Sequence, residues 1–270
     1  MPSKPAFVLL PGAWCPSTFY EKLVPRLQDF GYDAYSLDLP STLENEDTSP
    51  PSFYDDAKFV RLKIIELSDH GKTVVVVGNS YGGFLANEAI KGVLQSDRAS
   101  VGKKGGVLHF VVLASLLPIV GKTVSEHLTG LIPIDLDAPV DWFPSGPAEM
   151  SAQAFLNHLP EEEGLKYGGL TRSHSSKSFK DPITYAAYDH IPTTVVIGMD
   201  DVALKPEVQE ARVDEVIAAG NKHVKKTIIK ADHIPQLSHP DEIAQICVNA
   251  AQFSKPTQSY SCEDLGEPQH

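Results

Sequence analysis

The chain has 270 residues, of which 35 are acidic and 23 basic, giving a formal net charge of −12 at pH 7. This acidic balance argues against a nucleic-acid partner, and no run of about eighteen apolar residues is present that could span a bilayer. The three cysteines, Cys15, Cys247 and Cys262, form neither a disulfide framework nor a metal-ligand spacing. Apolar residues make up 42% of the chain, which is enough for the core of one large α/β domain.

Short apolar runs alternate along the chain with segments whose apolar residues recur at helical spacing. The run of four valines at 74–77 is typical of a strand that is buried on both faces. Alternating strands and helices predict a mostly parallel sheet with helices on both faces, an α/β fold. In chain order we expect strands at 7–10, 34–37, 73–77, 110–113, 194–197 and 227–229, and helices at 18–30, 55–68, 83–95, 206–219 and 240–253.

Residues 118–190 interrupt this alternation, because they contain several prolines, scattered apolar side chains and no clear strand. A structureless loop of that length is uncommon inside a compact domain. We therefore predict a largely helical cap inserted between two strands of the sheet. The chain then divides into a core at 1–117 and 191–253, a cap at 118–190 and a polar, flexible tail at 254–270.

The segment GNSYGG at 78–83 fits the Gly-x-Ser-x-Gly pattern of a nucleophile elbow. It directly follows the valine-rich strand and directly precedes an expected helix, which is the setting that this motif requires. The turn would lift the hydroxyl of Ser80 above the sheet edge, and side chains at positions 78 and 82 would collide with neighbouring backbone. The helix N-terminus beneath the serine would favour developing negative charge. The alternative is a glycine-rich turn that carries an incidental serine.

A serine hydroxyl needs a base to become a nucleophile at neutral pH. In this architecture an acid and then a histidine follow the serine in chain order. The last two expected strands are followed by the pair Asp200 and Asp201 and by His233. Because the carboxyl ends of parallel strands share one edge, these side chains can meet Ser80. We expect Asp201 to orient His233, with Asp200 as the alternative acid and Asp232 as a neighbour that stabilises the loop.

Two backbone N–H groups are expected to form an oxyanion hole. The first belongs to Tyr81, which follows the nucleophile, and the second belongs to Ala13 in the loop after the first strand. Gly12 would let that loop pass close to the serine. Gly12 and Trp14 are the neighbouring candidates for the second donor, and Trp14 has the alternative role of packing under the cap.

These motifs together resemble the α/β-hydrolase superfamily, in particular the small branch that includes plant methylesterases and hydroxynitrile lyases. The resemblance extends over nearly the whole chain, to about residue 253, and implies the α/β-hydrolase fold and a serine nucleophile with neither metal nor cofactor. The segments that carry it are VLLPGAW at 8–14, SLDLP at 36–40, GNSYGG at 78–83, GMDD at 198–201 and DH at 232–233.

The chain departs from that branch in two places. The usual His-Gly pair of the first loop is replaced here by Pro11 and Gly12. The hydroxynitrile lyases carry a threonine in that loop and a lysine after the catalytic histidine, and the matching positions here are Gly12 and Ile234. Cyanohydrin cleavage is therefore not expected. Gly12, Trp14 and Ile234 are expected to border the substrate pocket.

We expect a hydrolase that cleaves a carboxylic ester or lactone of a hydrophobic small molecule through an acyl-enzyme, without cofactor, metal, nucleic-acid or membrane partner. Two alternatives stay open: hydrolysis or lysis of a C–C bond in a polyketide-like substrate by the same triad, and a non-catalytic small-molecule receptor. The N-terminal residues lack the pattern of a signal peptide, so a cytoplasmic location is expected. The oligomeric state is open between a monomer and a homodimer.

Overall fold

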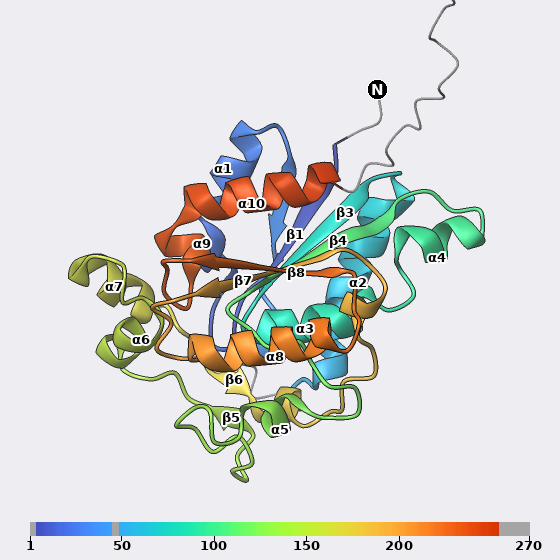
Figure 1. The fold of residues 1–270 in the computed structure, drawn as a ribbon. Helices are drawn as coiled ribbons and strands as arrows, with labels where there is room; N and C mark the ends of the chain where they lie inside the picture. The colour runs from blue at the N-terminus through green and yellow to red at the C-terminus, as the bar shows by residue number, and fades with distance from the viewer. Residues whose placement is uncertain (1–3, 45–48, 254–270) are drawn as a thin grey trace, which may run out of the picture.

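The computed structural model describes residues 4–44 and 49–253, and a six-stranded sheet runs through their centre (Figure 1). Its order is β2-β1-β3-β4-β7-β8, and every neighbouring pair is parallel. The mostly parallel sheet predicted from the sequence is thereby confirmed. The strands are β1 (Ala6–Leu10), β2 (Asp33–Ser36), β3 (Thr73–Asn79), β4 (Gly106–Leu113), β7 (Thr193–Gly198) and β8 (Val224–Ile229).

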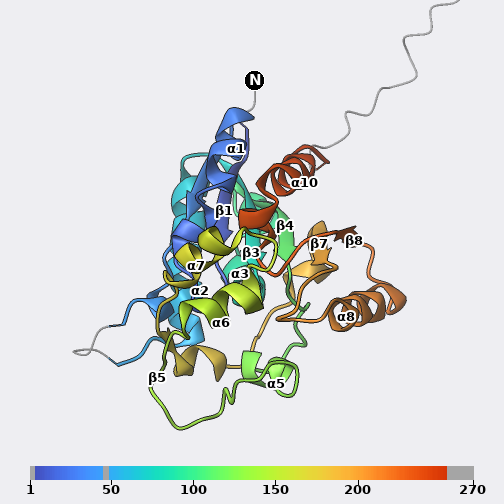
Figure 2. The same cartoon turned by 90° about the vertical axis from the view of Figure 1, so that its left-hand side faces the viewer.

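Helices cover both faces of the sheet, as the alternating pattern predicts (Figures 1 and 2). On one face lie α1 (Leu23–Asp29) and α10 (Pro240–Phe253), and on the other lie α2 (Phe53–Asp69), α3 (Tyr81–Ile90) and α8 (Pro206–Ala218). Shorter elements complete this part of the chain: the 3-10 turns Ser17–Tyr20 and Pro40–Thr42, α4 (Gln95–Ser100) and α9 (Pro235–Ser238).

Two expected helices were predicted too long, and in each case one residue explains the difference. The helix expected at 18–30 begins only at Leu23. In a longer helix, the ring of Pro25 would clash with the carbonyl group four residues earlier, and proline has no N–H to donate to that carbonyl. The helix expected at 83–95 ends at Ile90, because Gly92 adopts a left-handed conformation with φ 75° just beyond its end.

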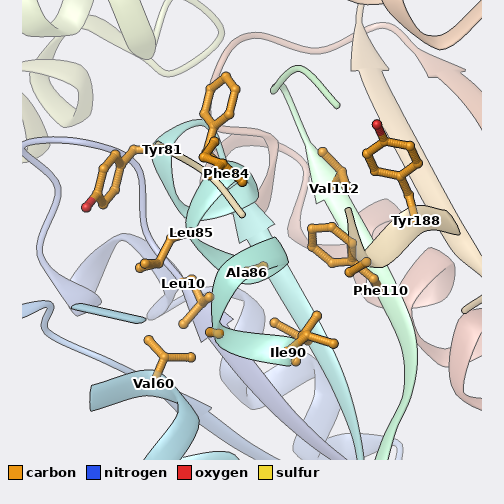
Figure 3. Packing of buried hydrophobic residues seen from close by; sticks show 14 of the residues in the cluster. Leu10, Val60, Tyr81, Phe84, Leu85, Ala86, Ile90, Phe110, Val112 and Tyr188 are labelled. Carbon is orange, nitrogen blue, oxygen red and sulfur yellow. The ribbon is translucent and has the colours of Figure 1, made fainter. Parts of the chain in front are cut away.

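The side chains of β3 alternate between the two faces of the sheet. Val74 and Val76 belong to the apolar cluster under α2 and α3, whereas Val75 and Val77 belong to the cluster under α1 and α10. All four are fully buried, as the valine run predicts. Figure 3 shows other members of the first cluster, namely Leu10 from β1, Val60 from α2, Leu85 and Ile90 from α3 and Phe110 from β4.

Residues 118–190 combine short helices, a small antiparallel strand pair and irregular segments. The two helices α6 and α7 lie side by side in both views (Figures 1 and 2). The strand pair has two residues in each strand, which is too short to leave an alternating pattern in the sequence. The elements are α5 (Val124–Leu128), β5 (Trp142–Phe143), α6 (Ala148–Phe155), α7 (Glu161–Gly168), β6 (His174–Ser175) and the 3-10 turns Ser176–Phe179 and Ala187–Asp189. The expected flexible tail at 254–270 lies outside the described residues.

The strand order reverses between β1 and β3. From β1 the chain moves outward to β2, and it then crosses back to β3 on the other side of β1. The crossover helices α1 and α2 consequently lie on opposite faces. Ligands of open α/β sheets bind where the order reverses in this way. Here that position lies between the loop after β1 and the turn that holds Ser80.

Candidate active site

Ser80 occupies a strained turn between β3 and α3. Its backbone has φ 51° and ψ −118°, a conformation that costs an L-residue about 1–3 kcal/mol. Its N–H donates a hydrogen bond to the carbonyl oxygen of Leu113, 2.9 Å away. The turn leaves Ser80 half-buried at the carboxyl edge of the sheet. Within residues 4–44 and 49–253, the non-glycine residues with positive φ are Trp14, Ser80 and Ala114, one after each of β1, β3 and β4.

Glycines allow the turn to pack against the strand beside it. A Cβ added at Gly82 would overlap the backbone carbonyl of Leu10, and one at Gly78 would overlap the carbonyl of Gly82. A Cβ at Gly12 would lie 3.2 Å from the Cβ of Ser80, closer than most such contacts. The loop after β1 therefore passes directly over the serine, as the sequence predicts.

Ser115 holds the turn from the neighbouring strand and was missed in the sequence. Its Oγ donates a hydrogen bond to the carbonyl oxygen of Ser80 at 2.7 Å, and the same oxygen accepts the N–H of Gly83 at 2.8 Å. The only signal was its place just beyond β4, at the same sheet edge as the expected site. Because Ser115 is fully buried, its hydroxyl serves this contact and not solvent.

His233 and Asp201 form a buried pair at the ends of β8 and β7. The His233 Nδ1 and the Asp201 Oδ2 are 2.8 Å apart, and the two residues are 5% and 3% exposed. The other carboxylate oxygen of Asp201 accepts the N–H groups of Ala203 and Leu204, at 2.9 and 2.8 Å. The side chain of Gln209 donates to Asp201 Oδ2 at 2.9 Å. These four contacts fix the carboxylate in the orientation that meets the imidazole.

The environment of His233 favours its protonated form. Burial of the ring acts to lower its pKa, but the negative charge of Asp201 and the hydrogen bond to it act in the opposite direction. The charge of Asp232 adds to them, and the net result is a pKa above the ordinary histidine value of 6.5. An imidazole with these neighbours is suited to accept a proton and to hold it while charge develops nearby.

Asp200 and Asp232, the neighbours of this pair in sequence, contact the insertion instead. The carboxylate of Asp200 lies 3.0 Å from the ring Nε2 of His158. Asp232 accepts the backbone N–H of His158 at 3.1 Å and the hydroxyl of Ser238 at 2.6 Å. Asp200 thus faces His158 and Asp201 faces His233, and Asp232 connects its own loop to the end of α6.

Asn79 connects the serine turn to the histidine loop. Its side-chain amide donates hydrogen bonds to the backbone carbonyls of His233 and Leu113, at 2.9 and 3.2 Å. Asn79 is fully buried and directly precedes Ser80. The three strand ends that carry Leu113, Ser80 and His233 are therefore joined by one side chain.

The two expected oxyanion donors, the N–H groups of Ala13 and Tyr81, have no internal acceptor in the described part of the chain. The Trp14 N–H, by contrast, is bonded to the Nδ1 of His174 at 3.1 Å. Of the neighbouring candidates for the second oxyanion donor, Trp14 is already engaged, whereas the Gly12 N–H, like that of Ala13, donates no hydrogen bond within residues 4–44 and 49–253. The turn is closed by the Cys15 N–H, which donates to the Gly12 carbonyl at 3.2 Å.

Aromatic rings surround the loop after β1. The ring of Trp14 lies 5.9 Å from that of Phe179 and 6.5 Å from that of Phe143. On the other side of the site, the half-buried ring of Phe155 lies 5.6 Å from the imidazole of His233. Ile234 is only 1% exposed and packs in a separate cluster with Cys15, Phe19, Leu156, Tyr167 and Leu237.

Within residues 4–44 and 49–253, no three His, Cys, Asp or Glu side chains converge so that they could hold a metal ion. None of the helices in this part of the chain is long and apolar enough to cross a bilayer. One open depression of about 520 Å³ is lined by α8 and the loop that follows it. A second, of about 630 Å³, is lined by the ends of α2 and α4. Neither depression borders Ser80.

Residues 7–246 match the alpha/beta hydrolase family, and the chain belongs to that family. It is therefore an enzyme of the α/β-hydrolase class. Among its relatives, probable hydrolase R7 of a Phoma species is 27% identical over 249 residues, which are 92% of this chain and 99% of that protein. Alpha/beta hydrolase nvfD of Aspergillus novofumigatus is 27% identical over 253 residues, 92% and 97% of the two chains.

Solved structures with the same fold include esterases of the branch that the motifs resemble. Methylesterase MES16 from Arabidopsis superposes with a TM-score of 0.70 at 18% identity, covering 92% of this chain and 99% of its own. Polyneuridine aldehyde esterase gives 0.69 at 19% identity, with the same coverage. A pyrethroid hydrolase from Sphingobium faniae gives 0.68 at 19% identity, covering 92% and 98%. These likenesses concern the fold.

Proposed function

We propose that the protein is a serine hydrolase that cleaves a carboxylic ester or lactone of a hydrophobic small molecule. The observation that carries the proposal is the buried His233–Asp201 hydrogen bond of 2.8 Å, in a loop that Asn79 ties to the strained turn of Ser80. A serine on such a turn, a histidine and an orienting carboxylate are the parts that acyl transfer requires.

In the acylation step, the Ser80 Oγ attacks the substrate carbonyl carbon while its proton moves to the Nε2 of His233. Asp201 holds the Nδ1 side of the ring and stabilises the imidazolium that forms. The negative charge on the carbonyl oxygen is bound by the N–H groups of Tyr81 and Ala13. His233 then returns the proton to the leaving alkoxide, the C–O bond breaks, and the acyl group stays on Ser80.

In the deacylation step, a water molecule attacks the acyl carbon and gives its proton to His233. The same two N–H groups bind the second oxyanion. Collapse of this intermediate releases the carboxylic acid, and His233 returns the proton to the Ser80 oxygen. Each N–H donor of an oxyanion hole contributes a factor of about 10²–10³ to turnover.

The rings near the site support a hydrophobic substrate. Phe155 lies beside the imidazole of His233, and Trp14 lies beside the proposed donor of Ala13 with Phe143 and Phe179 behind it. Apolar walls with a few polar groups are typical of small-molecule sites. The names of the structural neighbours point the same way, since they include a methylesterase, polyneuridine aldehyde esterase and a pyrethroid hydrolase.

The test is turnover of short p-nitrophenyl esters by the wild type and by Ser80→Ala. We expect a burst of nitrophenolate from the wild type and none from the variant, with a fluorophosphonate adduct mapped to Ser80. Hydrolysis that survives in Ser80→Ala, or an adduct on another serine, overturns the proposal. Tight ligand binding without turnover or adduct would instead favour a receptor. Carbon–carbon cleavage is recognised by product mass spectrometry on β-diketone substrates.

A further inference from the structure

His174 lies in β6 of the insertion and is fully buried against the loop after β1. Its Nδ1 accepts the backbone N–H of Trp14 at 3.1 Å. Two residues earlier, the backbone N–H of Arg172 donates to the carbonyl oxygen of Trp14 at 2.8 Å. The insertion therefore binds both backbone polar groups of a single residue in the proposed oxyanion loop.

The hydrogen bonds define the tautomer of His174. Because the Trp14 N–H donates to Nδ1, the ring proton is on Nε2, which lies 2.9 Å from the Oγ of Ser178. The hydroxyl of Ser178 donates in turn to the carbonyl oxygen of Ser175 at 2.8 Å. Burial lowers the pKa of His174 to about 3, so the ring stays neutral and keeps Nδ1 as an acceptor at any ordinary working pH.

The same ring touches both halves of the proposed oxyanion hole. It packs edge-to-face on Tyr81, with ring centroids 4.9 Å apart, and lies 5.7 Å from the ring of Trp14. Tyr81 supplies one proposed donor through its own backbone, and Trp14 follows Ala13, which supplies the other. His174 thus contacts both donor segments, as does Phe179 of the insertion, whose ring lies 5.9 Å from that of Trp14 and 5.5 Å from that of Tyr81. Of these two rings, His174 is the one that also accepts a backbone N–H of the loop.

Trp14 needs such support because of its backbone. It has φ 64° at the third position of the Gly12–Cys15 turn, a place that usually requires glycine. A tryptophan in this left-handed conformation is held only if its surroundings favour it. Without the acceptor on His174, the Trp14 N–H would lose its partner and the turn could relax, which would rotate the neighbouring N–H of Ala13.

We propose that His174 is a positioning residue that holds Trp14 in its left-handed conformation and thereby aims the Ala13 N–H at the oxyanion. The inference rests on the proposed serine hydrolase function, and it adds a residue that acts through the turn and not on the substrate. The insertion then does more than cover the substrate, because it completes the oxyanion hole.

Three variants separate this role from simple packing. His174→Leu keeps an apolar side chain but removes the acceptor. His174→Asn places an oxygen close to the position of Nδ1, whereas His174→Gln places its amide near Nε2. We expect kcat for a p-nitrophenyl ester to fall about 10- to 100-fold in His174→Leu and His174→Gln, part of the loss of a complete donor. His174→Asn should recover most of it, and KM should change less than about threefold, since the oxyanion forms only after binding.

A second measurement reports the oxyanion hole directly. The affinity for an aryl trifluoromethyl ketone, which forms an oxyanion on Ser80, should fall in proportion to kcat/KM across the three variants. The matched control is His127→Leu, because His127 also accepts a backbone N–H within the insertion, that of Ile119 at 2.8 Å. It contacts neither Trp14 nor Tyr81, and its kcat should stay at the wild-type value.

The proposal is overturned if folded His174→Leu turns over like the wild type, or if His127→Leu loses as much activity. It is equally overturned if His174→Asn and His174→Gln have the same kcat. If His174→Leu fails to fold, this comparison of the Asn and Gln variants decides the question. Failure of the underlying function would look different, because Ser80→Ala would then keep its activity whatever the residue at 174.

Discussion

The side-chain amide of Asn79 donates a hydrogen bond to the backbone carbonyl oxygen of His233, 2.9 Å away, across 154 residues of sequence. The same amide also donates to the carbonyl oxygen of Leu113. Since Asn79 directly precedes Ser80, this contact sets the position of the histidine loop relative to the proposed nucleophile. A rigid relation of this kind is what proton transfer between Ser80 and His233 would need.

Asn79→Asp should therefore be strongly disruptive, because it replaces the donor with a carboxylate that faces two carbonyl oxygens. We expect the free energy of unfolding to fall by about 1–3 kcal/mol. We also expect kcat to fall by more than the fraction of molecules that this destabilisation would unfold. Denaturant titration and ester turnover measure the two effects. Asn221→Asp is the matched control, because the Nδ2 of Asn221 also donates to two acceptors, the carbonyl oxygen of Tyr188 and the Oδ1 of Asp189. Asn221 precedes β8, at the end of the sheet opposite to Ser80. Wild-type kcat in Asn79→Asp would contradict the role given to this contact.

Asp201→Asn and Asp200→Asn test which of two adjacent carboxylates serves His233. Asp201 contacts the Nδ1 of His233, while Asp200 contacts His158. We expect Asp201→Asn to lower kcat by about 10⁴, the effect of the same change in other triads, because the amide favours the wrong imidazole tautomer. Asp200→Asn should change kcat less than about threefold. Equal losses in both variants, measured with the same ester, would argue against Asp201 as the orienting acid.

The parts of the site that could be predicted from sequence are those with local signals. A buried valine run, a Gly-x-Ser-x-Gly turn and the order of acid and histidine all lie within short segments, and each marks the end of a strand. Pro25 and Gly92 were also visible signals, and they account for the two helices that were predicted too long. Both kinds of inference depend only on backbone rules that act over a few residues.

The supporting contacts could not be predicted, because they join residues that are far apart in sequence. Trp14 and His174 are separated by 160 residues, and His174 lies in a two-residue strand that no periodicity reveals. Ser115 and Asn79 have ordinary polar side chains whose importance follows only from the strands beside them. Residues that touch the reacting groups carry a motif, whereas residues that hold those groups in place are defined by the fold.

In the proposed mechanism, the pH dependence of kcat/KM reports the proton affinity of His233 in the free enzyme. Only the neutral imidazole can accept the Ser80 proton, so activity should rise with pH through the pKa of this group. Burial acts to lower that pKa, but Asp201 and Asp232 raise it above 6.5 overall. We therefore expect the midpoint of the acidic limb to lie above pH 6.5 in the wild type. In Asp201→Asn, where burial is no longer opposed by that charge, the midpoint of the residual activity should move to lower pH. An unchanged midpoint in Asp201→Asn would show that the acidic limb does not report the titration of His233.

Asp56 gives the fold a pH dependence of its own, in which neither His233 nor Asp201 takes part. Its buried carboxylate accepts the hydroxyl of Tyr81 at 2.8 Å and the N–H of Ser41 at 2.9 Å. Burial raises its pKa to about 6 from 3.8, even though both hydrogen bonds act to lower it. A carboxyl group whose pKa is higher in the folded than in the unfolded state stabilises the fold in its protonated form. This stabilisation is complete at pH values below the unfolded-state pKa, and it is lost as the pH rises through the folded-state pKa.

Asp56→Asn removes this titration. Between about pH 4 and pH 6, the wild type should lose up to about 3 kcal/mol of unfolding free energy relative to the variant, from a shift of roughly two pKa units. The neighbouring Asp55→Asn provides a control of opposite sign, because hydrogen bonds from the Ser52 side chain and N–H lower the pKa of Asp55. Its stabilising contribution is present above the unfolded pKa and is lost as the pH falls. Urea titrations of both variants and the wild type distinguish the two when they extend below pH 3.8, where Asp55 titrates, as well as across the range of Asp56. Parallel curves for Asp56→Asn and the wild type between about pH 4 and pH 6 would contradict the raised pKa of Asp56.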